Sequence, residues 1–530
     1  MNSLPGQRKD ESIVSRAKLY LFKKKTRRLE QGQPWVYAGE IERMEGEAEP
    51  GAMVDVLASN GRYLASGYWN PASQIRVRVI ARQPEVELDE IFLTAKLQEC
   101  RAHRERFLNE RDCRLVYGEA DYLPGLVVDR FADVLVVQIL TLGMDLRREE
   151  LVKALVSVFQ PKGIYERSDV GVRKLEGLEE RTGVLYGDCP RIVEIVENGI
   201  VMEVDLVEGQ KTGYFYDQRE NRASIEPLMK GWGARSGISL EQRPVDELPD
   251  GWEAASPSGA IFAKKVEGGA AAAGQAVAGN SLMAESRIHA QEAEQDGSRM
   301  ALVPVNRGGK VVTYPLWDGA TVLECFAHTG SFTLHACKYG AKKVTCLDVS
   351  EHAIETARRN VERNGFSDRV EFVVDDAFQY LRQQMKGIEE RTFRAGVAAG
   401  AAGTKGAGAK SVDTSKPMSG GGRTWDVVIL DPPAFAKTKG AVEGACRGYK
   451  DINLHGMKLV NEGGYLVTAS CSYHMKPELF LETIQDAAAD AGKSLRLIEW
   501  RAAGKDHPQL LGVAEGHYLK FAVFEVRSLA

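Results

Sequence analysis

Near its C-terminal end the chain reads TASCSYHM (residues 468–475), in which Cys471 stands between two serines after the apolar run YLVTA. A thiol at the end of a strand can attack an electron-poor carbon if an acid nearby stabilises the adduct. Such an acid stands in WDVVILDPP, where two prolines stop a strand directly after Asp431, since neither can donate a ladder hydrogen bond. Cys471 as nucleophile and Asp431 as acid are therefore the first candidates. The alternative for Cys471 is a buried, inert thiol.

Acidic residues also end strand-like runs further upstream. Glu324 lies in VLECFAHTGSF, Asp348 ends KVTCLD, and VVDDAF contains Asp375 and Asp376. The first junction lacks both GxGxxG and GxxxxGK[ST], which argues against a pyrophosphate site, although Gly330 lets the backbone approach a ligand closely. Carboxylates at strand ends suit a cofactor with cationic or hydroxyl groups, and Asp348 can accept hydrogen bonds from ribose hydroxyls.

This series of strand ends resembles the S-adenosylmethionine site of class I methyltransferases. The residues that would contact the cofactor are Glu324, Phe326, Gly330, Asp348, Asp376 and Ala377. Asp375 or Asp376 would take the adenine amino group, with Asp376 and Ala377 favoured at the adenine edge. The alternative for each acidic strand end, taken alone, is the N-cap of the helix that follows.

The turn after Asp431 resembles the base-binding loop of methyltransferases that act on nucleic-acid bases. Phe435 would stack on a base, or else pack in the core. Cytosine C5 is too weak a nucleophile to take a methyl group directly, whereas addition of a thiolate to C6 makes C5 enamine-like. Asp431 would then bond the N3 and amino edge of the base. Methylation of an exocyclic amine needs no thiol, so Cys471 separates the two chemistries.

The elements that must position these residues alternate between strand and helix from about residue 320 onward. Apolar strands that alternate with helices predict an α/β domain with a parallel, doubly wound sheet, in which ligands bind beyond the carboxyl ends of the strands. Two stretches rich in Gly, Ala and Ser, at about 232–310 and 395–424, interrupt this pattern. We expect both to be flexible insertions.

Residues 15–88 read as short β segments separated by turns, followed by an α+β region over 89–198. The β-rich part carries the basic run KKKTRR, which includes Lys24, and the strand-like QIRVRV, in which Arg76 and Arg78 share one face. These cations predict contacts with an RNA backbone. The alternative is a solvated charged face.

Composition narrows the choice of function. The chain has 530 residues and a net charge of -5, so it is large enough for several domains and is not a globally basic protein. Its eight scattered cysteines show no zinc-like spacing, which predicts neither a disulfide framework nor a metal site. Signal-like and membrane-spanning apolar runs are lacking, so we expect a cytoplasmic protein with no membrane partner.

Longer motifs allow a family to be named. Apart from the two insertions, the chain from about residue 15 onward resembles the ribosomal RNA large subunit methyltransferase I family, PUA-domain enzymes that methylate cytosine C5 in 23S rRNA. The motifs that carry the resemblance are PWVYAGEI, ASQIRVRV, KTGYFYDQRENR, FAHTGSF, DPPAF, GACRGYKDIN, SCSYHM, DHP and EGHYLK.

The resemblance implies a PUA domain over 15–88, an α+β middle domain over 89–198 and a Rossmann-like methyltransferase domain over 199–530. It makes Cys471 the nucleophile and Asp431 the acid that orients the base. It also implies that Gln218 and Arg219 close the cofactor cleft. The same resemblance implies that Arg447, Tyr449 and Lys450 face RNA. For these three residues, and for the two that would close the cleft, helix packing or a solvated surface is an equally good explanation.

We therefore expect a methyltransferase that forms 5-methylcytosine through a Cys471 adduct, with 23S rRNA or a large ribosomal subunit precursor as its partner. One alternative keeps the fold but methylates a guanine or an exocyclic amine. The other is a non-catalytic RNA-binding factor in ribosome assembly. Formation of a homodimer is left open.

Overall fold

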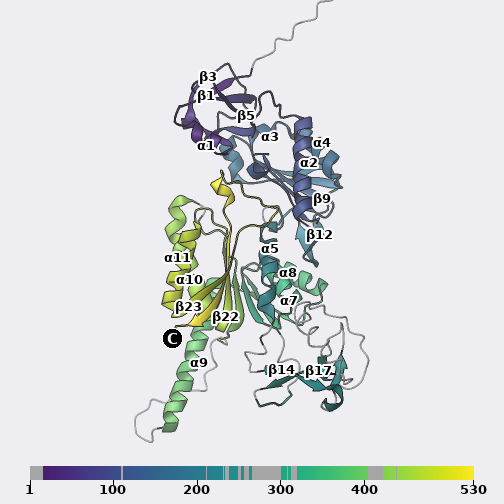
Figure 1. Ribbon diagram of the computed structural model, residues 1–530, viewed down its shortest axis with the longest axis vertical. Coiled ribbons are helices and arrows are strands. Elements are labelled where there is room, and N and C mark those ends of the chain that lie inside the picture. The colour runs from purple at the N-terminus through teal and green to yellow at the C-terminus, as the bar shows by residue number, and fades with distance from the viewer. Residues whose placement is uncertain are drawn as a thin grey trace, which may run out of the picture. The chain divides into compact units, whose positions relative to one another are not determined.

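The computed structural model describes residues 16–108, 111–209, 212–230, 232, 238–248, 252–255, 262–265, 300–306, 308–311, 319–403, 422–436 and 438–529 (Figure 1). Packing divides them into two compact units. The N-terminal unit comprises the described residues of Met1–Glu220 together with Ala503–His517, and the C-terminal unit comprises those of Asn221–Ala502 and Tyr518–Ala530. The three-domain division expected from the sequence remains our interpretation.

A six-stranded sheet of order β2-β6-β5-β4-β1-β3 opens the N-terminal unit. Its strands are β1 (Lys18–Leu21), β2 (Trp35–Tyr37), β3 (Ile41–Glu45), β4 (Met53–Ala58), β5 (Tyr63–Trp69) and β6 (Ile75–Ala81), and helix α1 spans Thr26–Glu30. Alternate residues of the strands fill its core, as Val54 and Val56 on β4 show, because side chains two apart point to the same face.

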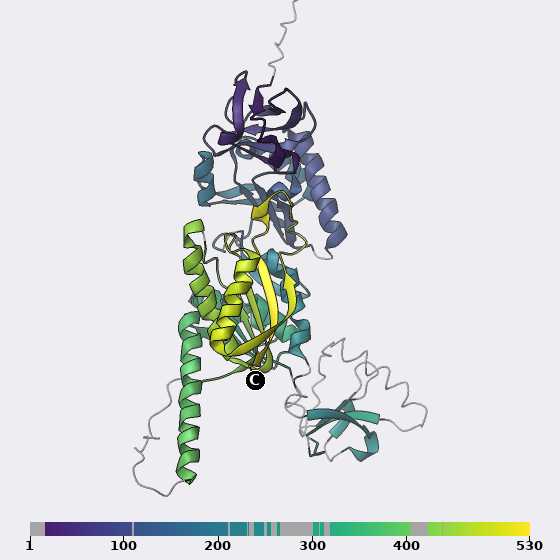
Figure 2. The ribbon, with the colours of Figure 1, turned by 60° about the vertical axis from the view of Figure 1, so that its left-hand side comes forward.

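A second sheet, of order β11-β10-β9-β8-β7, follows in the same unit. Its strands are β7 (Cys113–Tyr117), β8 (Leu126–Phe131), β9 (Val134–Ile139), β10 (Gly163–Ser168) and β11 (Arg181–Gly187); its helices are α2 (Glu90–Phe107), α3 (Leu142–Asp145) and α4 (Arg148–Phe159). The carboxylate of Asp89 caps α2 by accepting from the Phe92 amide. The hairpin β12 (Ile192–Glu197) and β13 (Ile200–Asp205), labelled at β12 in Figure 1, completes this part. Figure 2 shows the ribbon turned by 60°.

A buried carboxylate joins the two sheets of this unit. Glu176, in the 3₁₀ turn η3 (Gly171–Glu176), accepts from Asn70 at 2.9 Å, Ser73 at 2.7 Å and Arg78 at 2.9 Å. Arg78 is only 8% exposed. The expectation that Arg78 contacts RNA is therefore wrong for this structure, because Glu176 of η3 and Glu119 hold its guanidinium in the interior.

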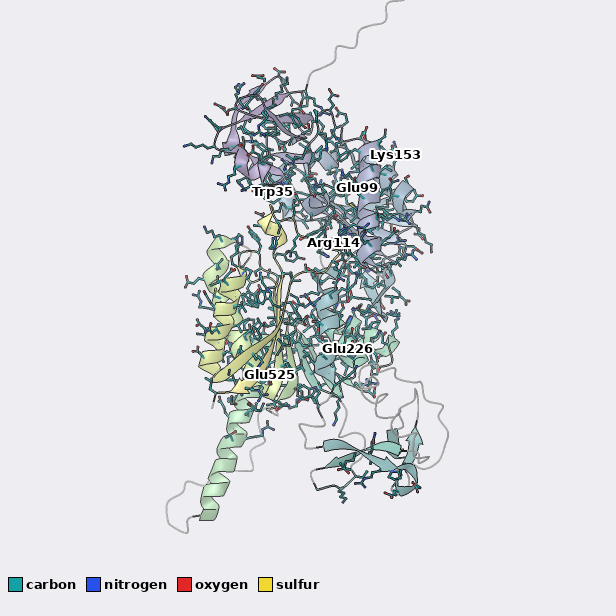
Figure 3. All side chains as sticks on the ribbon, viewed as in Figure 1. Trp35, Glu99, Arg114, Lys153, Glu226 and Glu525 are labelled. Carbon is teal, nitrogen blue, oxygen red and sulfur yellow. The ribbon has the colours of Figure 1, made fainter. Side chains whose placement is uncertain are left out.

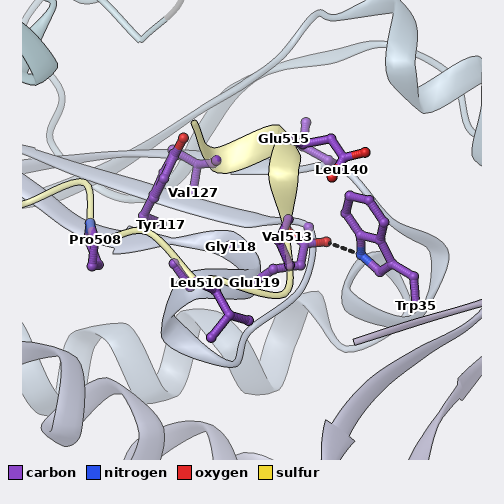
Figure 4. Close-up of a pocket in the computed structure, with 13 residues that line it drawn as sticks. Trp35, Tyr117, Gly118, Glu119, Val127, Leu140, Pro508, Leu510, Val513 and Glu515 are labelled. Carbon is purple, nitrogen blue, oxygen red and sulfur yellow. Dashed lines mark hydrogen bonds between the residues drawn. The ribbon is translucent and has the colours of Figure 1, made fainter. Parts of the chain in front are cut away.

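Residues 503–517, which join two strands of the other sheet in sequence, also belong to the N-terminal unit. Pro508, Leu510 and Val513 line a cavity of about 150 Å³ together with Trp35 and Tyr117 (Figure 4). The Trp35 indole N–H donates to Glu119, in η2 (Gly118–Asp121), at 2.8 Å. Figure 3 labels Trp35 and, on β7, Arg114, which makes a two-bond ion pair with the buried Asp129.

The C-terminal unit is built on a seven-stranded sheet of order β20-β19-β18-β21-β22-β24-β23. The strands are β18 (Thr321–Cys325), β19 (Lys343–Asp348), β20 (Val370–Val374), β21 (Trp425–Leu430), β22 (Val460–Ser470), β23 (Lys493–Arg501) and β24 (Lys520–Ser528). The first five in chain order are parallel, and β24 runs antiparallel between β22 and β23. The predicted α/β domain with a doubly wound parallel sheet is confirmed.

Helices cover both faces of this sheet, with α10 and α11 on one side and α7 and α8 on the other (Figure 1). They span α7 (Ser331–Lys338), α8 (Glu351–Arg363), α9 (Ala377–Gly403), α10 (Val442–Lys458) and α11 (Pro477–Ala491), while α5 (Arg219–Ser224) contains the division between the units. On α8 the buried residues Ala353, Ile354, Ala357 and Val361 recur at helical spacing, which directs one stripe toward the sheet.

The two predicted insertions lie largely outside the described residues. Within the first, four strands form a small sheet of order β14-β17-β16-β15: β14 (Ile238–Pro244), β15 (Trp252–Ala255), β16 (Phe262–Lys265) and β17 (Met300–Asn306). Within the second, α9 continues to Gly403. These parts differ from the flexible chain that we expected. The expectation rested on the overall Gly- and Ala-rich composition, which hides short β-prone runs such as MALVPVN.

The Glu176 cluster predicts a large cost for losing one carboxylate. Glu176→Ala would remove the nearer carboxylate of the buried Arg78 guanidinium, at 2.9 Å, and leave only Glu119, at 3.2 Å; breaking a buried ion pair destabilises by about 3–5 kcal/mol. We expect urea denaturation of the full chain, followed by Trp fluorescence, to show an earlier first transition. Lys174→Ala in the same turn, which removes an exposed pair with Glu180, should leave that transition unchanged. Equal midpoints for both variants would contradict this account.

Candidate active site

The ends of β21 and β22 bring the two principal candidates together. These strands are parallel neighbours, with Leu430 paired to Thr468, so Asp431 and Cys471 both follow at the carboxyl edge of the sheet. The Cys471 thiol donates to the carbonyl oxygen of Pro432, with the sulfur at 3.9 Å. Cys471 is partly exposed, whereas Cys325 and Cys346 on neighbouring strands are fully buried. Cys471 is thus partly open to solvent in the SCS turn, next to the turn that the prolines create.

Ser472 fastens the two turns to each other. Its hydroxyl accepts from the Ala436 amide at 3.1 Å and lies 3.1 Å from the Tyr449 hydroxyl. Ala436 closes the DPPAF turn and Tyr449 lies on α10, so one hydroxyl links three elements around Cys471. The turns are therefore held in a fixed relation on the floor of the site.

An aromatic row lies beneath this floor. Phe435 packs between Phe378, at 5.9 Å, and Tyr449, at 4.7 Å between ring centroids. Tyr449 is 0% exposed, so the expectation that it faces RNA is wrong for this structure. Its place in the stripe Ala445, Tyr449, Ile452 on α10 explains the burial. Phe435 is half-buried and belongs to the same core, the second of the two roles expected for it.

The turn after β18 has an unusual backbone. Phe326 (φ 64°), His328 (φ 50°) and Gly330 (φ 79°) all adopt positive φ, which is uncommon for residues other than glycine. The carboxylate of Asp348, at the end of β19, accepts from the amides of His328 at 2.8 Å and Ser350 at 2.9 Å. These bonds hold the turn open beside the neighbouring strand end. Burial lowers the pKa of His328, which favours its neutral ring.

Glu324 has a different environment from the one we expected. It is 2% exposed, and its carboxyl accepts from the Thr333 amide in the first turn of α7 at 2.7 Å, and from the Thr333 hydroxyl. Burial raises the pKa of Glu324 to about 8, and the nearby charges of Asp431 and Asp348 add to the effect. Glu324 is thus a mostly protonated group behind the turn.

Asp376 bonds the Gln379 amide at 3.0 Å, as expected of an N-cap of α9. Ala377, which follows it, is buried. Both lie at the end of β20, next to β19. The strand ends that were predicted to line the cofactor site therefore share one edge of the sheet.

The remaining predicted residues are spread over both units. Gln218 and Arg219 are buried in the N-terminal unit, where Arg219 bonds the Asp112 carbonyl and lies 3.6 Å from both Glu197 and Asp506. Arg219 is therefore part of a buried ionic cluster of the N-terminal unit.

The surface cations fall into two groups. Lys24 is exposed in the turn between β1 and α1, and Arg76 is half-buried on β6. On α10, Arg447 is exposed and pairs with Glu443 at 2.6 Å, and Lys450 pairs with Asp490 at 2.8 Å.

Sequence reasoning missed two features. Lys520, the first residue of β24, is 1% exposed, and burial lowers its pKa to about 8. In EGHYLK it looks like an ordinary strand-end lysine, and only the pairing of β24 with β22 places it beside SCS. The second feature is an open cavity of about 550 Å³ in the N-terminal unit, lined by Arg101, Arg104, Arg111 and Arg130 among others.

No group of three or more His, Cys, Asp or Glu side chains among the described residues could hold a metal ion. Over the same described ranges, no helix has the length and apolar character needed to cross a membrane. All eight cysteines are free thiols.

Comparison with known proteins agrees with this architecture. A PUA-like domain model matches residues 19–82, and a methyltransferase domain model matches 322–401. A solved SAM-dependent methyltransferase from Streptococcus mutans shares the fold over 96% of this chain and 99% of its own, with a TM-score of 0.61 at 17% identity. The structure of SMU.776, a methyltransferase complexed with SAH, superimposes with a TM-score of 0.63 over the same shares, also at 17% identity.

The fold and the strand-end site thus define an S-adenosylmethionine-dependent methyltransferase of class I. Two curated relatives are named ribosomal RNA large subunit methyltransferase I. The one from Aliivibrio fischeri (strain ATCC 700601 / ES114) is 34% identical over 95% of this chain and 97% of its own. The one from Shewanella amazonensis is 34% identical over 94% and 96%. The chain belongs to the ribosomal RNA large subunit methyltransferase I family.

The raised pKa of Glu324 predicts a pH-dependent stability. The unfolded chain loses this proton near pH 4.5 and the folded chain near 8, so the native state loses stability as pH rises between these values, by at most about 1.4 kcal/mol per pH unit. Glu324→Gln, which mimics the protonated acid, should flatten this dependence. Urea denaturation at pH 5.5, 6.5 and 7.5 measures it, and parallel curves for the two proteins would show that Glu324 ionises normally.

Proposed function

We propose that this chain forms 5-methylcytosine in 23S rRNA, with Cys471 as the nucleophile and Asp431 as the acid that orients the base. The observation that carries the proposal is the 3.9 Å contact between the Cys471 sulfur and the Pro432 carbonyl, which joins the SCS and DPP turns. A partly exposed thiol next to a carboxylate-bearing turn is what addition to a base requires. Methylation at an amino group would leave the thiol without a use.

The strand-end residues fit the expected cofactor. Asp348 stands at the end of β19 as an acceptor for ribose hydroxyls, and the positive-φ turn at Phe326 and Gly330 lets the backbone approach a ligand closely. Asp376 and Ala377 stand at the next strand end for the adenine edge. Glu324, buried against Thr333, would support this turn from behind. When bound, S-adenosylmethionine supplies an electrophilic methyl group on a positively charged sulfur.

The chain's own groups would then act as follows. The Cys471 thiolate adds to cytosine C6, which forms an S–C6 bond and gives C5 the electron density of an enamine. Asp431 hydrogen-bonds the N3 and amino edge of the base as charge develops there. After C5 has been methylated, a base removes the C5 proton, the electron pair restores the C5–C6 double bond, and the S–C6 bond breaks to regenerate the thiolate. That base is unassigned.

Ribosomal RNA as the substrate follows from the names of the relatives and from the PUA-like module. Lys24 and Arg76 on that module, and Arg447 and Lys450 on α10, are the cations proposed to meet the RNA backbone. The cavity lined by Arg101, Arg104, Arg111 and Arg130 adds little free positive charge, because the first three arginines pair with Glu105, Asp121 and Asp133. The target base would be flipped out of its stack or taken from a loop.

Cys471→Ala should abolish 5-methylcytidine formation, a loss of several orders of magnitude, because it removes the thiolate that activates C5. Asp431→Asn should lower the rate by about 10²–10⁴-fold. The measurement is nucleoside mass spectrometry of protein-free 23S rRNA incubated with deuteromethyl-labelled cofactor.

Cys446→Ala is the matched control, since Cys446 is another partly exposed thiol of the same unit, and it should retain activity. Label on guanine or on an amino nitrogen, or activity that survives Cys471→Ala, would overturn the C5 mechanism. Cofactor binding without any methylated product would favour an assembly factor.

The role of Asp348 can be tested separately. Asp348→Asn keeps one oxygen acceptor for the turn but removes the negative charge offered to the ribose, so the Kd for S-adenosylmethionine should rise about 10-fold. Isothermal titration calorimetry measures the Kd. Glu371→Gln, on the neighbouring strand β20 and paired with Arg423, serves as a control that should leave it unchanged.

A further inference from the structure

A buried ammonium group lies behind the proposed nucleophile. Lys520 pairs with Ser470 in the antiparallel register of β24 and β22, one residue before Cys471. Its Nζ donates to the carbonyl oxygens of Ser472 and Tyr518, both at 2.6 Å. Two fixed acceptors therefore hold the ammonium against the SCS turn, and the side chain does not extend to solvent.

The charges around Lys520 are unequal. Burial is the main cause that lowers its pKa, the Lys476 cation acts in the same direction, and the negative charge on Cys471 opposes both. A lysine is rarely this buried without an anion, because desolvation of the ammonium is costly. In the described part of the chain, Cys471 is the group whose negative charge, once ionised, would raise the pKa of Lys520. The interaction is reciprocal, so a nearby ammonium favours the thiolate over the thiol.

We propose that Lys520 is a positioning residue that keeps Cys471 as a thiolate, by fixing an ammonium group beside the SCS turn. The thiol proton leaves to solvent, and the charge that remains on sulfur is balanced by Lys520. When Cys471 ionises, it loses its hydrogen bond to the Pro432 carbonyl, and the Lys520 ammonium compensates for that loss. The catalytic use of this pair rests on the proposed function; its existence does not.

Alkylation of Cys471 as a function of pH tests the pair without any methyl transfer. The full-length protein is treated with iodoacetamide between pH 5.5 and 9 and digested with trypsin. Peptide 459–493, in which Pro477 protects the bond after Lys476, contains Cys471 as its one cysteine, and peptide 440–447 contains Cys446, which serves as the internal reference. We expect the pH midpoint of Cys471 alkylation to lie at least about one unit below that of Cys446.

Lys520→Gln retains amide donors for both carbonyls but removes the charge. It should raise the Cys471 midpoint by about one unit, which means roughly 10-fold slower alkylation at pH 6.5. Lys520→Arg keeps the charge and should preserve the low midpoint. If the midpoint is unchanged in Lys520→Gln, the proposal is wrong. Circular dichroism and cofactor binding show whether each variant is folded.

Other titratable groups face Cys471 and are common to all these variants. Asp431 lies in the adjacent turn, and Tyr449, whose pKa burial raises to about 12, stays neutral over the range used. Lys476 lies over the Tyr473 ring at 4.3 Å and is exposed. Lys476→Gln is therefore the matched control, because solvent screens its charge, and we expect no more than a slight change of the midpoint.

The two proposals fail separately. A normal, Lys520-independent midpoint together with loss of methylation in Cys471→Ala would leave the nucleophile in place and remove Lys520 as its partner. A low midpoint that depends on Lys520, together with methylation that survives Cys471→Ala, would keep the ion pair and remove its catalytic use.

Discussion

The parallel pairing of β21 with β22 is the constraint on which the candidate active site depends. The two prolines after Asp431 cannot continue the ladder, so β21 ends while β22 runs on to Ser470. That difference in length places the SCS turn against the Pro432 carbonyl. Ser472 then fixes the arrangement through Ala436 and Tyr449. A site built from strand ends is rigid because each turn is attached to a buried strand.

Two ionisable side chains near this edge are buried with pKa values close to 8. Burial raises the pKa of the Glu324 carboxyl and lowers that of the Lys520 ammonium. Both shifts have the same cause, desolvation of the charged form, and they act in opposite directions because the charges differ in sign. Glu324 supports the turn after β18 from behind, and the Lys520 ammonium lies next to the SCS turn that carries the thiol. Burial makes the charged form of each group unfavourable, and buried groups with shifted pKa values are typical of functional sites.

Motifs that act through the backbone were predicted well from the sequence. Local sequence is enough to predict the end of a strand at the prolines of DPP, the position of Asp348 at a strand end, and the apolar strands. The errors arose where burial depends on a distant segment. Arg78 is held by Glu176 of η3, roughly 100 residues later in the chain, and Lys520 acquires its environment only when β24 inserts beside β22. The error on Tyr449 has another cause. Its spacing from Ala445 and Ile452 is that of a buried helical stripe, so its burial could have been predicted from the sequence.

The position of β24 also explains why the end of the chain belongs to the site. Because β24 runs antiparallel to β22, it begins at the edge of the sheet where β22 ends. The first residue of β24 therefore meets the last residues of β22, whichever chain segment precedes it. In this chain the preceding segment, residues 503–517, packs in the N-terminal unit. The same antiparallel insertion that completes the sheet thus delivers a buried ammonium to the SCS turn.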